Sequence, residues 1–293
     1  MPLNYHMPLY RPPSEAENLI IQVTLGCSFN RCSFCSMYRS KQYSQRPLED
    51  VIEDIGRAAR SAPDARRVFL ADGDALSLST EQLVAILDAL HAVFPMLNRV
   101  SCYATPANLL GKGADELTLL KQRGLKLLYL GIESGSNLIL KKITKGASQR
   151  GIAEAMQKAS DAGLKVSATV ILGLGGKSRW QEHIDGTIEL LNRAPVTYFS
   201  MLQIYLEDEI TAEFRDKFAE PFEFQEDHAI LLEQQRLISG INPPRPVIFR
   251  SNHASNALAL AGNLPRDRGK ILAQLQAALA GQEPLRPWCL RGM

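Results

Sequence analysis

Three of the chain's five cysteines stand close together in the stretch TLGCSFNRCSFCSMY, where Cys27, Cys32 and Cys35 follow the spacing C-x4-C-x2-C. Clustered cysteines form disulfides in secreted proteins, whereas in reducing compartments they bind metals or take part in catalysis. The N-terminus has no basic segment followed by a long apolar run, so we expect a cytoplasmic protein with reduced thiols. The three cysteines are therefore predicted to bind a metal.

The spacing of the cysteines distinguishes between the possible kinds of metal centre. Structural zinc normally takes four Cys or His ligands in two pairs, and no second pair stands nearby in the sequence. Plant-type ferredoxins share the spacing but need a fourth cysteine, and Cys102 falls within a predicted strand as a small buried side chain. Three thiolates leave one iron of an iron–sulfur cluster open, which makes that iron a site for a substrate or cofactor.

The stretch GCSFNRCSFCSMY resembles the cluster loop of the radical S-adenosylmethionine (SAM) enzymes. Their usual pattern is C-x3-C-x2-C with an aromatic residue before the last cysteine, here Phe34, and this chain has one additional residue in the first gap. The resemblance implies a four-iron, four-sulfur (4Fe-4S) cluster bound by Cys27, Cys32 and Cys35, with SAM as the second cofactor. It also implies a 5′-deoxyadenosyl radical that abstracts hydrogen from the substrate.

Three further motifs resemble the SAM-binding segments of this family, in the expected order. FLADGDAL resembles the turn that binds the methionine amino group, LYLGIESGSN resembles the ribose-binding strand, and VILGLGG resembles the strand end near adenine. LYLGIESGSN is closest to the branch of methylthiotransferases, elongator-type proteins and oxygen-independent coproporphyrinogen oxidases. The cofactor-binding residues implied are Phe34, Gly73, Asp74, Glu133, Ser134, Gly173 and Gly175.

Simpler roles are open for several of these residues. Asp74 follows a strand, where Asp commonly caps the next helix, and Ser134 can shape a turn. Gly175 suits a permissive turn. Glu133 is different, because a carboxylate at the mouth of a buried strand is costly unless it is paired or hydrogen-bonded.

The elements that position these residues alternate between β-rich and helical patterns. Strands are predicted at 18–25, 66–71, 99–104, 126–132, 165–172 and 196–205, with amphipathic helices between them. This predicts an α/β fold, a partial (β/α)6 TIM-like barrel, with a doubly wound open sheet as the alternative. We expect an N-terminal arm at 1–17, the radical SAM barrel at 18–206 and a mostly helical C-terminal extension at 207–293 that closes the barrel.

Candidate substrate residues follow the later strands. Asn252 and His253 lie in SNHASN after the predicted strand PVIFR, and Gln203 and Tyr205 end the sixth strand. Active-site residues of parallel barrels stand at such strand ends. The alternative for the loop 251–256 is that its Asn and Ser residues cap turns, and strand alternation also allows Gln203 and Tyr205 to face the helices.

Composition narrows the substrate and partners. Net charge is +2 without long charge runs, which argues against a nucleic-acid partner and favours a small polar substrate. No apolar stretch is long enough to span a membrane. The resemblance to radical SAM enzymes implies an electron donor such as a flavodoxin or ferredoxin. The alternatives to a radical SAM enzyme are an iron–sulfur electron-transfer or cluster-carrier protein, and a zinc-loop scaffold or nucleic-acid module.

Overall fold

The computed structural model describes residues 3–218 and 220–292, which form two compact units. The first unit comprises the chain up to Asn30 together with Met37–Leu130 and Lys158–Val166. The second comprises Arg31–Ser36, Gly131–Gln157 and the chain from Ser167 onwards. The cysteine loop is thereby divided, with Cys27 in the first unit and Cys32 and Cys35 in the second.

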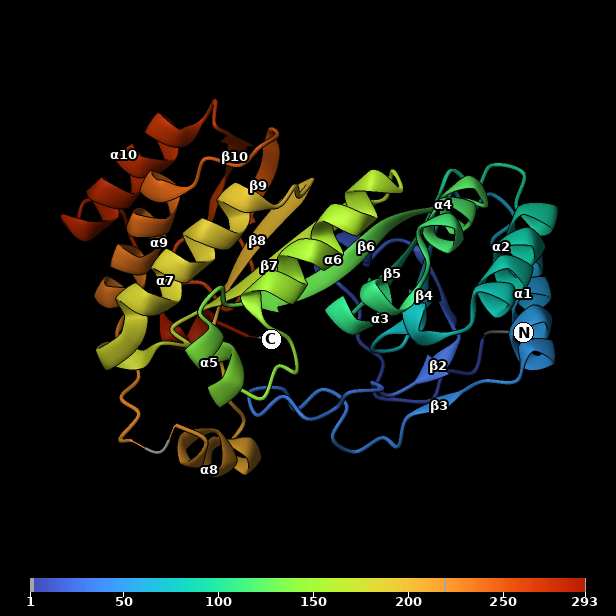
Figure 1. The fold of residues 1–293 in the computed structure, drawn as a ribbon, viewed down its shortest axis with the longest axis horizontal. Coiled ribbons are helices and arrows are strands. Elements are labelled where there is room, and N and C mark those ends of the chain that lie inside the picture. The colour runs from blue at the N-terminus through green and yellow to red at the C-terminus, as the bar shows by residue number, and fades with distance from the viewer. Residues whose placement is uncertain (1–2, 219, 293) are drawn as a thin grey trace. The chain divides into compact units, whose positions relative to one another are not determined.

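The first unit is a parallel sheet with helices. Its strands follow the order β1-β4-β5-β6, and each neighbouring pair is parallel. Helices α1 and α2 lie side by side (Figure 1), and α2 begins with a capping box between Ser79 and Gln82. The elements are η1 (Pro13–Glu15), β1 (Leu19–Gln22), β2 (Thr24–Leu25), β3 (Ser44–Gln45), α1 (Leu48–Ser61), β4 (Arg67–Ala71), η2 (Ala75–Ser77), α2 (Thr80–Val93), β5 (Arg99–Ala104), α3 (Pro106–Gly111), α4 (Ala114–Gln122) and most of β6 (Leu125–Glu133).

The second unit also combines a sheet with helices. Strands β7, β8 and β9 are parallel neighbours, and β10 pairs with β9 in the antiparallel direction. Helix α9 lies between α7 and α10 (Figure 1). The elements are α5 (Asn137–Lys142), α6 (Gln149–Asp161, whose end belongs to the first unit), β7 (Lys165–Leu172, whose start belongs to the first unit), α7 (Gly176–Arg193), β8 (Tyr198–Gln203), α8 (Asp208–Asp216), α9 (Asp227–Gly240), β9 (Val247–Ser251), β10 (Leu260–Leu264), α10 (Arg268–Leu279) and η3 (Trp288–Leu290).

The predicted α/β fold class is confirmed, with strands in barrel-type order. A doubly wound sheet reverses its strand order at a switch point, and neither unit contains such a reversal. The six predicted strands correspond to β1 with β2, β4, β5, β6, β7 and β8. The C-terminal region adds β9 and β10 to its helices, so it contributes strands as well as the predicted helices. The boundaries of arm, barrel and extension stay a prediction.

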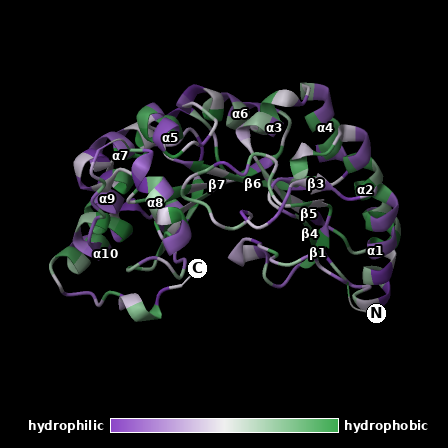
Figure 2. Ribbon diagram, turned by 90° about the horizontal axis from the view of Figure 1, so that it is seen from below, coloured by the Kyte–Doolittle hydropathy of each residue, from purple (hydrophilic) through white to green (hydrophobic). Residues whose placement is uncertain are grey.

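The helices carry both hydrophilic and hydrophobic residues (Figure 2), as expected of helices that cover a sheet. In α1 the buried side chains are Val51, Asp54, Ile55 and Ala58, which recur three and four residues apart on one face. The strands behind the helices are buried almost throughout, as in β4, where only Arg67 is exposed. Within the described residues, no helix is both long and apolar enough to cross a membrane.

Candidate functional site

In the first unit, the turn at Cys27 is held by the end of β4. Gly26 has a left-handed φ of 70°, its N–H donates to Asp72 Oδ2 at 3.1 Å, and its carbonyl accepts from Gly73 N–H at 3.0 Å. A Cβ on Gly73 would lie 2.8 Å from Cys27 Cβ, closer than side chains can approach. Gly73 is therefore required for Cys27 to pack against this strand end.

Asp72 is the centre of a buried polar network in this unit. Its Oδ2 also accepts from Gln22 Nε2 at 3.1 Å and from Lys41 Nζ at 2.8 Å. The Asp72 side chain has no exposed surface and that of Lys41 is 9% exposed. The network joins β1, β4 and the segment after the cysteine loop. The sequence motifs did not indicate a role for Asp72 or Lys41.

Asp74 contacts the cysteine loop through Ser28. Ser28 N–H donates to Asp74 Oδ1 at 3.0 Å, and the Ser28 hydroxyl donates to Oδ2. Burial raises the pKa of Asp74 above its usual value, against the opposing effect of these hydrogen bonds. Asp74 precedes η2, but its side chain makes no capping hydrogen bond, so the capping alternative is not realised. Its role in binding the cofactor stays a prediction.

Asn30, between the first two cysteines of the loop, has an unusual backbone conformation. Asn30 has a φ of 39°, in the left-handed region that Asn tolerates better than most residues. Its Nδ2 donates to the Tyr38 carbonyl at 2.8 Å. The side chain thus bridges the two ends of the loop, a role that the sequence did not indicate.

In the second unit, Cys32 and Cys35 belong to a turn that is attached to the end of α5. Cys35 N–H donates to the Cys32 carbonyl at 3.2 Å, and Ser33 N–H donates to the Ile143 carbonyl at 3.0 Å. Phe34 packs against a buried cluster formed by Ile139, Ile143, Leu174, Phe214 and Phe218. Phe34 therefore anchors the turn to this apolar cluster. Both cysteines are partly exposed.

Glu133 is the last residue of β6, and its buried carboxylate forms an ion pair with Lys145. Such pairing is expected of a carboxylate buried at the end of a strand. Glu133 Oε1 accepts from Lys145 Nζ at 2.9 Å, and the side chains of Glu133 and Lys145 are 8% and 11% exposed. Burial alone would lower the pKa of Lys145, but the charges of Glu133, Cys32 and Cys35 raise it above its usual value. Lys145 is therefore an ammonium that faces one carboxylate and the two cysteines of this unit. Sequence reasoning did not identify it.

The backbone at Glu133 is unusual. Its φ is 60°, and a Cβ on Gly131 would lie only 1.9 Å from Glu133 Oε1. The carboxylate thus folds back over the glycine. A larger residue at position 131 would displace the Glu133 carboxylate from its place beside Lys145.

Ser134 has a structural contact at the same strand end. Its Oγ lies 2.8 Å from His183 Nδ1, and His183 Nε2 lies 3.0 Å from the Ile171 carbonyl. Burial lowers the pKa of His183 to about 4, so the ring is neutral and donates from Nε2 to that carbonyl. Nδ1 then accepts from the Ser134 hydroxyl. Ser134 thus connects the end of β6 to β7 through His183 of α7, and its role in binding the cofactor stays a prediction.

The glycine-rich segment after β7 forms a tight turn into α7. Gly173 has a φ of 86°, and its N–H donates to Glu233 Oε2 on α9 at 2.8 Å. Gly176 N–H then donates back to the Gly173 carbonyl at 3.0 Å. Gly175 is the N-cap residue of α7, where a Cβ would lie 2.6 Å from the Arg179 carbonyl oxygen. We call the segment from Gly173 to Gly176 the glycine turn.

The predicted substrate residues lie at the ends of β8 and β9. Gln203 N–H donates to Asn256 Oδ1 at 2.7 Å, and Asn256 Nδ2 donates to the Met201 carbonyl at 2.8 Å. Asn256 therefore attaches the loop after β9 to β8. Gln203 is buried, and its Oε1 has no hydrogen-bond partner among the described residues. Tyr205 is 44% exposed and stacks on Trp288 with ring centroids 6.4 Å apart.

His253 is held in one tautomer. Its Nδ1 accepts from Ser255 N–H at 3.1 Å, and burial followed by the charge of Arg286 lowers the pKa of His253. The neutral ring therefore carries its proton on Nε2. Asn252, the neighbouring residue, is exposed. The loop thus combines a structural residue, Asn256, with side chains whose polar atoms are available.

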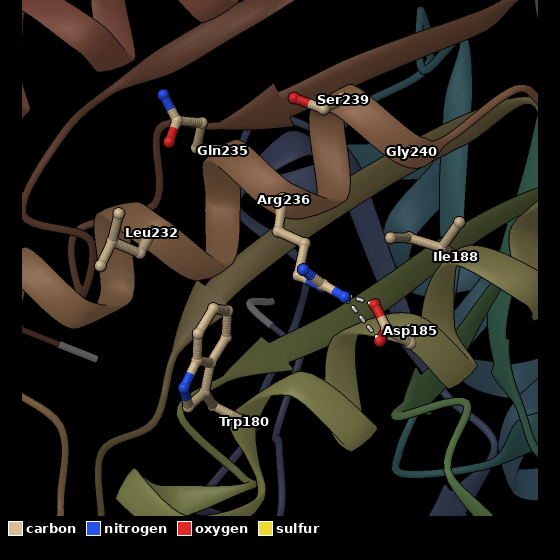
Figure 3. Close-up of a pocket in the computed structure, with 8 residues that line it drawn as sticks. All are labelled: Trp180, Asp185, Ile188, Leu232, Gln235, Arg236, Ser239 and Gly240. Atoms are coloured by element: carbon tan, nitrogen blue, oxygen red, sulfur yellow. Dashed lines mark hydrogen bonds and ion pairs between the residues drawn. The ribbon is translucent and has the colours of Figure 1, made fainter.

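A surface groove of about 570 Å³ lies elsewhere in the second unit, between α7 and α9 (Figure 3). The Arg236 guanidinium pairs with Asp185 at 2.6 and 2.8 Å and lies over the Trp180 ring. None of the predicted site residues lines this groove. Its most basic group already has a partner, so the groove is not the candidate site.

The donor chemistry of the cysteine loop fits an iron–sulfur cluster. None of the five cysteines, all of which are described, forms a disulfide. Among residues 3–218 and 220–292, no three His, Cys, Asp or Glu side chains are grouped closely enough to hold a metal ion. The three loop thiols lie in two units, and each part has its own support, from Gly73 in the first and from Phe34 and Lys145 in the second.

Comparison with known proteins agrees with these motifs. The heme chaperone HemW of Bacillus subtilis is 24% identical over 182 residues, which are 62% of this chain and 47% of that protein. A putative methylthiotransferase of Methanocaldococcus jannaschii is 29% identical over 186 residues, which are 58% of this chain and 39% of that protein. The chain thus spans less than half the length of these relatives. The second confirms the predicted likeness to methylthiotransferases.

Solved structures share the fold. The radical SAM methyltransferase TsrM from Kitasatospora setae has a TM-score of 0.50 at 19% identity, over 64% of this chain and 36% of that protein. The hydrogenase maturase HydG from Carboxydothermus hydrogenoformans has a TM-score of 0.50 at 16% identity, over 76% and 52% respectively. The model of the radical SAM superfamily matches residues 21–191, more than half of the chain. The chain therefore belongs to the radical SAM superfamily, whose enzymes use a 4Fe-4S cluster and SAM.

Proposed function

We propose that this chain binds a 4Fe-4S cluster through Cys27, Cys32 and Cys35 and cleaves SAM reductively to act on a small polar substrate. The observation that supports this best is the buried ion pair of Glu133 and Lys145. The charges of Cys32 and Cys35 also raise the pKa of Lys145. When bound, the cluster supplies the electron that breaks a carbon–sulfur bond of SAM. This chain's own residues bind and orient the cofactor.

Glu133 and Lys145 have complementary roles in this proposal. The Glu133 carboxylate accepts one hydrogen bond from Lys145 and has further acceptor capacity for ribose hydroxyls. The Lys145 ammonium would offset part of the repulsion between negatively charged thiolates at Cys32 and Cys35. Gly73 and Asp74 would contact the methionine part of SAM, and the turn from Gly173 to Gly175 would contact adenine.

The substrate would be oriented at the ends of β8 and β9. His253 offers a donor at Nε2, Gln203 offers a buried acceptor without a partner among the described residues, and Asn252 and Tyr205 are exposed. A net charge of +2 supports a small polar metabolite over a nucleic acid. We expect a flavodoxin or ferredoxin to deliver the electron in the cytoplasm.

Metal content tests the cysteine assignment. After anaerobic reconstitution we expect about four iron atoms and four sulfides per chain. Cys32→Ala should lose most of this iron. Cys102→Ala is the matched control, because Cys102 is fully buried and its burial raises the pKa of the thiol to about 12, which keeps it protonated. Full iron in the Cys32 variant, or its loss in the Cys102 variant, contradicts the assignment.

Binding of SAM distinguishes the proposed enzyme from a cluster carrier. The reconstituted protein should bind SAM in calorimetry, whereas a carrier should hold iron and sulfide without binding it. Zinc in place of iron after anaerobic purification would favour the zinc-loop alternative. Substrate-dependent formation of 5′-deoxyadenosine from candidate metabolites would then identify the substrate class.

A further inference from the structure

Glu233 on α9 is an acid in an apolar interior. It has no exposed surface, and no cation lies within ion-pair distance of it among the described residues. Its Oε2 accepts a hydrogen bond from Gly173 N–H at 2.8 Å. A buried carboxyl is costly and is seldom present without a function. The Glu233 carboxyl lies beside Gly173, the first residue of the glycine turn.

The glycine turn is built closely around this contact. Gly173 has a φ of 86°, and a Cβ at this position would lie 2.9 Å from Ile204 Cγ2 and 3.2 Å from Ile230 Cδ1. Apolar side chains therefore surround the Gly173 amide, and Glu233 is its acceptor. Without that acceptor the buried Gly173 N–H would be unsatisfied, and the peptide would be held only through its other end, where the Leu172 carbonyl accepts from Ile204 N–H at 2.9 Å.

We propose that Glu233 is a positioning residue for the nucleotide part of the cofactor, because its hydrogen bond from Gly173 N–H fixes the direction of the glycine turn. This inference rests on the proposed function, in which the turn contacts adenine. Glu233 itself does not contact the cofactor. It acts from α9, behind the turn.

The surroundings of Glu233 fit a neutral carboxyl. Its second oxygen, Oε1, and the Oε1 of Gln225 are both buried acceptors without a hydrogen-bond partner among the described residues. A proton on Glu233 would make its carboxyl a donor as well as an acceptor. Burial raises the pKa of Glu233 to about 8, against smaller effects of the Gly173 N–H and Gln225. A glutamine at position 233 would therefore preserve the hydrogen bond to Gly173.

The experiment compares SAM affinity among variants of the reconstituted full chain. Glu233→Gln should stay within about twofold of wild type, whereas Glu233→Leu should bind SAM about tenfold more weakly at unchanged iron content. Ile238→Ala is the matched control, since it removes buried packing from the same helix, five residues after Glu233. It should lower the melting temperature and leave SAM affinity unchanged. If Glu233→Leu does not fold, Glu233→Asp withdraws the acceptor by one methylene and should weaken binding in the same direction.

The possible outcomes are distinguishable. Wild-type protein that binds no SAM overturns the proposed function and this inference together. Wild-type protein that binds SAM, with Glu233→Leu or Glu233→Asp binding equally well, overturns this inference alone. Equal losses of affinity in Glu233→Gln and Glu233→Leu contradict the neutral acceptor. A loss in Ile238→Ala that matches the loss in Glu233→Leu assigns the effect to helix packing and also overturns the inference.

Discussion

Asp72 in the first unit and Glu133 in the second both stand at the carboxyl end of a parallel strand, yet they use their carboxylates differently. Three groups from different parts of the chain, on Gln22, Gly26 and Lys41, donate to one oxygen of Asp72. Among the described residues, one group, Lys145 Nζ, donates to Glu133. Asp72 Oδ2 joins several segments and so holds a loop in place, although Asp72 Oδ1 has no hydrogen-bond partner in that part of the chain. Glu133 Oε1 has one partner and therefore retains acceptor capacity for a ligand.

The largest expected effect lies on the Asp72 side of this comparison. Lys41→Met would leave the Asp72 carboxylate buried without its cation, and breaking a buried pair in this way costs about 3–5 kcal/mol. Denaturant unfolding of the apoprotein measures this loss. Arg123→Met is the control, since Arg123 and Asp88 are 45% and 48% exposed and such pairs contribute about 1 kcal/mol or less. Equal losses in both variants would show that the Asp72 network does not hold the loop.

Glu233 extends the comparison to a carboxyl without a cation. Its folded-state pKa of about 8 lies above the ordinary 4.5, so its contribution to stability is present below pH 4.5 and is lost as the pH rises towards 8. Glu233→Gln cannot ionise, and it should exceed wild type in unfolding free energy at pH 8 by roughly 2–4 kcal/mol, but not at pH 4.5. Parallel pH dependences of the two proteins would mean that Glu233 ionises normally in the folded state.

Glu133 should affect SAM binding as well as folding, because Glu133→Gln also leaves the buried Lys145 ammonium without its carboxylate. Glu133→Gln keeps the shape of the side chain and removes the charge that receives ribose hydroxyls. Because a hydrogen bond to a charged group contributes about 1.5–3 kcal/mol, SAM affinity should fall roughly tenfold or more. Calorimetry on reconstituted protein measures this change, and iron content should stay at the wild-type level. Unchanged affinity would remove Glu133 from the site and end the contrast with Asp72.

The smallest expected effect concerns Asn30 in the cysteine loop. Asn30→Gly keeps the left-handed conformation and loses the hydrogen bond to Tyr38, which contributes about 1 kcal/mol, and a long 3.5 Å contact with the Lys41 carbonyl. Asn30→Val adds the strain of a β-branched residue at positive φ, about 1–2 kcal/mol more. The melting temperatures should therefore fall in the order wild type, glycine variant, valine variant. A valine variant as stable as the glycine variant would contradict the role given to the left-handed turn.

Much of the fold could be predicted because its strands are short apolar runs between amphipathic helices. Strands β5 and β7 were predicted with their exact bounds, and β4 and β6 to within one residue at each end. Strand β10 was missed, since its residues LAGNL contain glycine and asparagine, which are poor strand formers. It is a strand only because β9 lies beside it.

The motifs predicted which strand ends carry polar groups, but they could not predict the partners. Lys145 is one of three lysines in the stretch KKITK, and only the fold shows which of them reaches Glu133. Glu233 and Gly173 are 60 residues apart on different elements, so no local pattern connects them. Buried polar contacts of this kind depend on tertiary packing rather than on propensity.

The central claim is that the cysteine loop and the Glu133 strand end together serve reductive SAM cleavage, and the formation of 5′-deoxyadenosine tests it most directly. Anaerobically reconstituted wild-type protein with dithionite and SAM should form 5′-deoxyadenosine even without substrate, at a slow rate. Cys102→Ala should do the same, and Cys32→Ala should form none. The account is contradicted if wild-type protein with a full cluster forms no 5′-deoxyadenosine, or if Cys32→Ala forms as much as wild type.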